Sequence, residues 1–238
     1  MIIIKRKKVI YIMFCLILGI SAYGFKISKE NNTLEVVSTP ATTKVIVLDA
    51  GHGGEDGGAV SKNGVSESNL NLKITLKVQQ LLEQSGATVI LTRSDENAIY
   101  DLDKKTLKEK KVSDIKNRVK IGNESSADFF ISIHLNKIPQ SQYSGWQTFF
   151  KDGDEESKML AQNIQKNLNN SIQKENKRES LKISNIYIID NVEIPTAIVE
   201  CGFLSNPEEE KLLQQEEYQN KLAWGIYTGI MDYCFQNK

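Results

Sequence analysis

Short apolar runs alternate with amphipathic segments from residue 44 almost to the C-terminus, and this alternation leaves few possible folds. Strands alternating with helices over so long a stretch predict an α/β sheet with helices on both faces. Six runs have the length and apolar character of strands: residues 44–49, 88–92, 128–134, 146–150, 186–189 and 196–200.

Four segments between or after these runs have helical spacing of apolar residues: 66–86, 159–172, a segment that starts at Asn206 and Pro207, and 222–233. Ser66 is expected to cap the first of these helices, and Gly86 to end it. The charged segments 104–111 and 174–180 are interpreted as solvated surface.

The N-terminal segment has the pattern of an export signal. Basic residues 5–8 precede the uncharged residues 9–25, which as a helix span roughly 26 Å. Residues 1–25 are therefore expected to be a signal peptide or an N-terminal membrane anchor, and the sequence leaves both open. The basic flank predicts that everything after residue 25 lies outside the cytoplasm. Residues 26–43 are expected to be a spacer, and 44–238 the folded domain.

The charge balance disfavours nucleic acid as a partner. The 238 residues include 30 basic and 30 acidic side chains, whereas a nucleic-acid binder usually has a basic surplus or a basic face. Three cysteines are too few to indicate a disulfide framework. Cys201 could be the nucleophile of a Cys–His pair, but a buried core thiol is the preferred interpretation.

Both histidines of the chain stand at the ends of predicted strands. His52 follows the first strand and His134 ends the third, while Glu200 ends the last. Ligands of such sheets bind beyond the carboxyl ends of the strands, so these side chains should converge on one edge. Glu67 opens the helix that follows the His52 loop and can face the histidines from the same edge.

Two imidazoles and one carboxylate are typical of a catalytic zinc site, which keeps one coordination position open. His52, Glu67 and His134 are therefore the expected ligands of one zinc ion, and Glu200 the group that takes and returns a proton. The reverse assignment, with Glu200 as ligand and Glu67 as an ordinary acid of a helix start, remains open. Asp49 and Glu55 are reserve candidates, either as ligands or as acceptors for the imidazole N–H groups.

Seven segments occur in the order typical of one enzyme family, and the chain resembles the zinc-dependent N-acetylmuramoyl-L-alanine amidases of type 3 from residue 44 to about 235. The segments are VIVLDAGHGGEDGGA, GVSESNLNL, VILTRSDE, DIKNRVKIGN, ADFFISIHLN, SGWQTFF and AIVECGFLSNPEE. The resemblance implies an open, mixed, mostly parallel sheet flanked by helices, and a catalytic domain at 44–238.

The same resemblance implies hydrolysis of the amide between N-acetylmuramic acid and the L-alanine of a peptidoglycan stem peptide. It makes His52, Glu67 and His134 the zinc ligands and Glu200 the catalytic residue. The short connection at residues 136–145 lacks the long helical insertion that blocks some members, so an open site is expected.

An N-terminal segment with a bare amidase domain most resembles the family members of endospore formers that act in sporulation. Those enzymes strip stem peptides so that muramic δ-lactam can form in the spore cortex. The implied location is extracytoplasmic, in a sporulating cell between the forespore membranes. Peptidoglycan is the expected partner, the membrane a further one if the N-terminal segment is uncleaved, and an activating protein of unknown identity a third.

Two other functions remain compatible with the residues. A zinc carboxypeptidase or endopeptidase of wall peptides would use the same metal set on a different amide. A non-catalytic peptidoglycan-binding module would need no Glu200 beside the metal, which argues against it.

Overall fold

The computed structural model describes residues 13–19, 21 and 39–237. The chain divides into two units, residues 1–37 and 38–238. In the first unit residues 13–19 are helical, and the signal or anchor predicted at 1–25 lies largely outside the described residues. No helix in the described part of the chain is long and apolar enough to cross a membrane.

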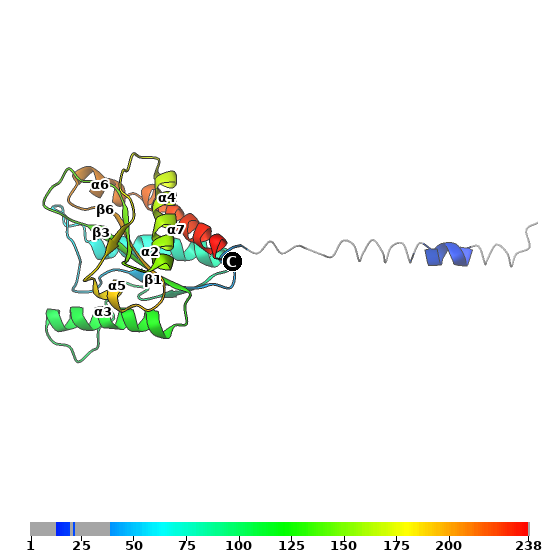
Figure 1. Cartoon of the computed structure of the whole chain (residues 1–238), viewed down its shortest axis with the longest axis horizontal. Helices are drawn as coiled ribbons and strands as arrows, with labels where there is room; N and C mark the ends of the chain where they lie inside the picture. The colour runs from blue at the N-terminus through cyan, green and yellow to red at the C-terminus, as the bar shows by residue number, and fades with distance from the viewer. Residues whose placement is uncertain (1–12, 20, 22–38, 238) are drawn as a thin grey trace, which may run out of the picture. The chain divides into compact units, whose positions relative to one another are not determined.

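A six-stranded sheet forms the centre of the second unit (Figure 1). Its strand order is β2-β1-β3-β6-β4-β5. All neighbours pair in parallel except β4 and β6, which are antiparallel, so the predicted mixed and mostly parallel α/β sheet is confirmed. The strands are β1 (Val45–Ala50), β2 (Thr88–Leu91), β3 (Phe129–Asn136), β4 (Gln147–Lys151), β5 (Leu181–Ile183) and β6 (Thr196–Phe203).

Helices cover both faces of the sheet, as predicted (Figure 1). One face packs a large apolar core against the helices α2 (Glu67–Gln84), α4 (Glu155–Ile172) and α7 (Glu216–Gln236). The other face carries a smaller cluster with α3 (Leu107–Glu124) and α5 (Tyr187–Asn191). Alternate residues of β3 show the division, since Ile131 and Ile133 belong to the large core and Phe130 to the small one.

The helices predicted around 66–86, 159–172, 206 and 222–233 are all present as α2, α4, α6 (Pro207–Leu213) and α7. Asn206 caps α6 by accepting hydrogen bonds from the backbone of Glu208 and Glu209. Ser66 occupies the cap position of α2, but its hydroxyl makes no cap hydrogen bond and donates to the Gly57 carbonyl instead.

The strand predicted at 186–189 is wrong, because this run forms α5. A run of four apolar residues has no periodicity that separates strand from helix. The sheet edge beside β4 is taken by β5 instead.

Helix α3 was not predicted, and only its first residues, 107–111, lie in the segment 104–111 interpreted as solvated surface. Its N-terminus is fixed by a capping box, in which Thr106 and Glu109 each bind the backbone N–H of the other. Much of its surface is indeed exposed, but Val119 joins the small core and Arg118 is buried.

The packed unit begins before residue 44. Ala41 is fully buried in the large core, and the Thr39 hydroxyl donates to the Ser85 carbonyl at 2.5 Å, while the Thr42 hydroxyl reaches the same carbonyl at 3.3 Å. The last residues of the expected spacer thus pack against the end of α2.

Candidate active site

His52 reaches the edge of the sheet through an unusual turn directly after β1. Its backbone has a φ of 62°, a left-handed conformation that is uncommon outside glycine. Only glycine fits at the preceding position 51, because a Cβ on Gly51 would lie 2.2 Å from Cε1 of the His134 ring. The two histidines can therefore approach each other only past a glycine.

Glu67 is the first residue of α2, and its carboxylate is held by backbone groups from two other segments. One oxygen, Oε2, accepts from the N–H of Ala59 at 2.7 Å, and Oε1 accepts from the N–H of Leu135 at 3.1 Å. The side chain is buried at the end of the sheet. These hydrogen bonds fix the carboxylate in one orientation, with Oε1 toward the histidines.

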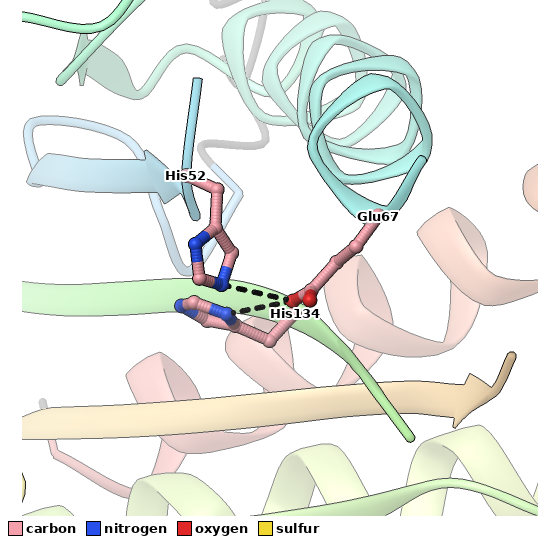
Figure 2. Close-up of side chains that lie close together, drawn as sticks. All are labelled: His52, Glu67 and His134. Carbon is pink, nitrogen blue, oxygen red and sulfur yellow. Dashed lines mark hydrogen bonds and ion pairs between the residues drawn. The ribbon is translucent and has the colours of Figure 1, made fainter. Parts of the chain in front are cut away.

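His52, Glu67 and His134 converge, as predicted (Figure 2). Glu67 Oε1 lies 3.0 Å from His134 Nδ1 and 3.4 Å from His52 Nε2, and one possible ligand atom from each residue lies within 4.8 Å of the others. The rings meet edge to face with centroids 5.1 Å apart. Although burial acts against its ionisation, the two histidines hold the pKa of Glu67 well below its usual range.

This donor set fits a zinc ion. Two imidazole nitrogens and one carboxylate oxygen are zinc's usual protein ligands in catalytic sites. They come from a β1 loop, a helix start and the β3 strand, so three rigid elements preorganise the group.

Asp56 is a site residue that the sequence did not single out. Its carboxylate lies 3.0 Å from His52 Nδ1 and also pairs with Lys111 at 2.8 Å. A proton on Nδ1 leaves the lone pair of Nε2 directed at the Glu67 side, which is the arrangement that metal-binding histidines use. Burial opposes it, but Asp56 and Glu67 together raise the pKa of metal-free His52 to about 9.

The two reserve candidates lie elsewhere. Asp49 is fully buried in a separate hydrogen-bond network, where it accepts from Arg118, Thr92 and Ser132. Glu55 is exposed and pairs with Lys110. Neither forms a hydrogen bond with an imidazole. The carboxylate that accepts from a histidine N–H is that of Asp56, the neighbour of Glu55.

Glu200 lies beside the three converging residues. In the parallel pair β3–β6 it stands opposite His134, so both side chains leave the same face of the sheet. Its Oε2 atom is buried without a hydrogen-bond partner among the described residues. Burial raises the pKa of Glu200 to about 7, to which the nearby Glu67 adds. A carboxyl group with such a pKa can exchange a proton at neutral pH.

Two buried arginines hold the loop that carries His52. Arg118 donates to the carbonyls of Ala50 and His52, both at 2.7 Å, and to Asp49 at 2.6 Å. Arg93 donates to the carbonyls of Ala50 at 2.8 Å and Gly51 at 3.1 Å. Their cationic hydrogen bonds satisfy backbone oxygens that the end of the strand leaves unpaired.

The site is open to solvent on the side of the histidines. The side chains of His52 and His134 are 28% and 19% exposed. The connection from β3 to β4 contains no helix, in agreement with the short connection without a helical insertion that the sequence predicts. Cys201 is fully buried in the large core, and burial raises the pKa of its thiol, so it is no partner for a histidine.

Comparison with known proteins places this geometry in a family. Residues 46–232 match the N-acetylmuramoyl-L-alanine amidase family, Amidase_3. The germination-specific N-acetylmuramoyl-L-alanine amidase of Bacillus subtilis is 38% identical over 229 residues, 96% of each chain. Among solved structures, the CwlD amidase from Clostridioides difficile, in complex with the GerS lipoprotein, is 45% identical with a TM-score of 0.80 over 82% of this chain and 100% of that one.

A second solved structure, an N-acetylmuramoyl-L-alanine amidase from Clostridium difficile 630, is 30% identical, with a TM-score of 0.72 over 83% of this chain and 100% of that chain. The family match spans the sheet from β1 to β6 and the helices that cover it, and it includes all four candidate site residues. The chain belongs to the N-acetylmuramoyl-L-alanine amidase family and is a peptidoglycan amidase.

Proposed function

We propose that this amidase cleaves the bond between N-acetylmuramic acid and L-alanine with one zinc ion held by His52, Glu67 and His134, and with Glu200 as the proton carrier. The observation that carries the proposal is the convergence of three ligand atoms within 4.8 Å beside a buried carboxylate oxygen that lacks a partner. A zinc ion there would supply a Lewis acid for the substrate carbonyl.

Other residues of the chain orient the ligands and transfer the proton. Asp56 orients the His52 ring, and Glu67 is held in place by the backbone of Ala59 and Leu135. Glu200, opposite His134, takes a proton from the attacking water and delivers it to the nitrogen of the departing L-alanine. Its raised pKa suits both steps, because the group must accept a proton and release it again within one turnover.

Matched glutamine variants separate ligand from proton carrier. Glu200→Gln is expected to keep zinc and to lose activity by roughly 10²- to 10⁴-fold, the usual contribution of a positioned acid or base. Glu67→Gln and His134→Ala are expected to lose zinc and activity together. Metal analysis of each folded variant is combined with mass spectrometry of the muropeptides released from purified wall. Full zinc in His134→Ala, or zinc loss in Glu200→Gln with retention in Glu67→Gln, would overturn the assignment.

The products of the same digestion identify the bond that is cut. An amidase releases peptides with a free L-alanine amino terminus and leaves glycan without peptide. Shortened stem peptides still attached to the glycan would instead indicate a carboxypeptidase or endopeptidase. Wall that binds the protein but stays intact would indicate a binding module.

We further propose that the enzyme acts outside the cytoplasm on spore cortex, where removal of stem peptides precedes muramic δ-lactam formation. Support comes from the similarity to a germination-specific amidase over 96% of both chains. Deletion of the encoding gene is expected to yield spores whose cortex lacks muramic δ-lactam, measured by muropeptide analysis. Spores with unchanged lactam content would refute this role.

A protein partner is part of the proposal. The similar CwlD amidase was solved in complex with a lipoprotein, which supports an extracytoplasmic activating protein for this chain as well. Affinity purification of the cross-linked full-length chain from sporulating cells tests it, and recovery without any associated extracytoplasmic protein would argue against it.

A further inference from the structure

Arg178 lies near the site, because it donates to Gln147, which stands opposite Glu200 in the sheet. Among the described residues its guanidinium forms no ion pair; Nε donates to the Ser144 carbonyl at 3.3 Å and Nη1 to Gln147 Oε1 at 3.2 Å. Nη2 makes no hydrogen bond within the described part of the chain. The arginine is half-buried, so one edge of its planar fork remains free for a ligand.

Aromatic rings hold this guanidinium in place. Its central carbon lies 4.8 Å from the ring centre of Phe203, at the end of β6, and 5.8 Å from that of Tyr143. Contact with the face of an aromatic ring is favourable for a cation and restricts its orientation. Glu209 is a buried acid that interacts with the charge of Arg178 at a distance, but its two oxygens accept from the N–H groups of Gly145 and Phe203. The guanidinium of Arg178 is thus held in place with one N–H edge that makes no hydrogen bond among the described residues.

The strand register places Arg178 in line with the catalytic group. His134 on β3 stands opposite Glu200 on β6, and Glu200 stands opposite Gln147 on β4. Residues opposite each other on neighbouring strands project from the same face of a sheet, with Cβ atoms about 5 Å apart. The order across the sheet edge is thus His134, Glu200, Gln147, and Arg178 donates to the last of these.

The substrate has a matching order. The carbonyl carbon that is attacked belongs to the lactyl group, and the next atom along the chain is the L-alanine nitrogen that receives the proton from Glu200. A stem peptide that leaves this nitrogen on the side of Glu200 away from His134 runs toward Gln147 and Arg178.

We infer that Arg178 binds a carboxylate of the departing stem peptide and makes the enzyme selective for an acidic peptide. This inference rests on the proposed function, in particular on Glu200 as proton carrier. In peptidoglycan the residue after L-alanine is a glutamate linked through its side chain, so its α-carboxyl is an anion unless it is amidated. An arginine fork matches a carboxylate in a bidentate geometry that an amide cannot reproduce.

Two muramyl peptides that differ only in whether this α-carboxyl is free or amidated test the inference on the full-length chain. Wild type is expected to favour the free acid in kcat/KM by about 10- to 100-fold, the range for a hydrogen bond to a charged group. Arg178→Gln is expected to lose this preference through slower cleavage of the acid, with the amide little affected. Arg178→Lys, which keeps the charge without the fork, is expected to retain part of the preference.

Lys177→Gln is the matched control, because it removes a positive charge from the same loop while its side chain is 88% exposed. It is expected to behave as wild type. Calorimetric binding of the product peptide, acid against amide, gives a readout independent of turnover. Melting curves show whether Arg178→Gln is folded. If it is not, the preference for acid over amide is compared between wild type and Arg178→Lys instead.

The outcomes distinguish this inference from the proposed function. Cleavage of neither muramyl peptide by wild type, together with an intact wall, would overturn the proposed function and the inference with it. Equal cleavage of both peptides by wild type, or a preference that survives in Arg178→Gln, would overturn the inference alone. A general loss of activity in Arg178→Gln, equal for acid and amide, would show a purely structural role for Arg178 and likewise overturn it.

Discussion

At the scale of single residues, the sequence predicted which side chains come together, because most of them stand at strand ends. His52, His134 and Glu200 follow apolar runs, and parallel strands bring their carboxyl ends to one edge. Asp56 was missed for a physical reason. Glu55 and Asp56 are adjacent acids, and only the tight turn that brings Gly53 and Asp56 together decides which one faces His52.

Asp56→Asn is expected to weaken zinc binding by about 10- to 100-fold, the usual cost of losing the partner that orients a metal-binding histidine. The amide keeps the shape of the side chain but loses the charge that holds the Nδ1 proton. Competition against a chromophoric chelator measures the zinc affinity. Glu55→Gln is the control, because its partner Lys110 lies outside the site, and it should bind zinc as wild type does. Equal affinities for the two variants would contradict the role of Asp56.

At the scale of elements, the strongly patterned segments were predicted, whereas α3, α5 and the short strand β5 were not. The apolar run at 186–189 is too short for its period to be read, and it forms α5. Helix α3 was missed because its N-terminal half is rich in charged residues and shows no clear helical spacing of apolar residues. The spacing of Thr106 and Glu109 was the available signal, since it is the signature of a capping box.

Thr106→Ala is expected to lower the free energy of unfolding by about 1 kcal/mol, because it leaves the Glu109 backbone N–H without its acceptor. Chemical denaturation measures the change. The neighbouring exposed Lys105 offers a control, and Lys105→Ala should change the unfolding energy by less than about 0.5 kcal/mol. A Thr106→Ala variant as stable as this control would show that the capping box does not stabilise α3.

At the scale of the whole molecule, the fold class followed from the alternation of strands and helices, whereas the strand order did not. The sequence gives no direct sign that β6 inserts between β3 and β4, or that β4 runs antiparallel to it. The start of the packed unit also escaped prediction, because residues 39–43 are threonines apart from Pro40 and Ala41 and show no period. Their contribution comes from contacts with the distant end of α2.

A chain shortened to begin at Lys44 is therefore expected to be less stable than one that begins at Ser38. It loses the buried methyl group of Ala41 and the hydrogen bonds to the Ser85 carbonyl, together about 2 kcal/mol. Both chains should keep their zinc, because all candidate ligands lie beyond residue 44. Thermal and chemical unfolding compare the two, and equal stabilities would show that residues 38–43 are only a spacer.

The central position of β6 has a consequence for when the proposed site can be complete. A chain synthesised from its N-terminus carries His52, Glu67 and His134 long before it carries Glu200. Until β6 is present, β3 and β4 have no strand between them, and Glu200 cannot stand opposite His134. The four candidate site residues can therefore come together only after nearly all of the polypeptide has been made.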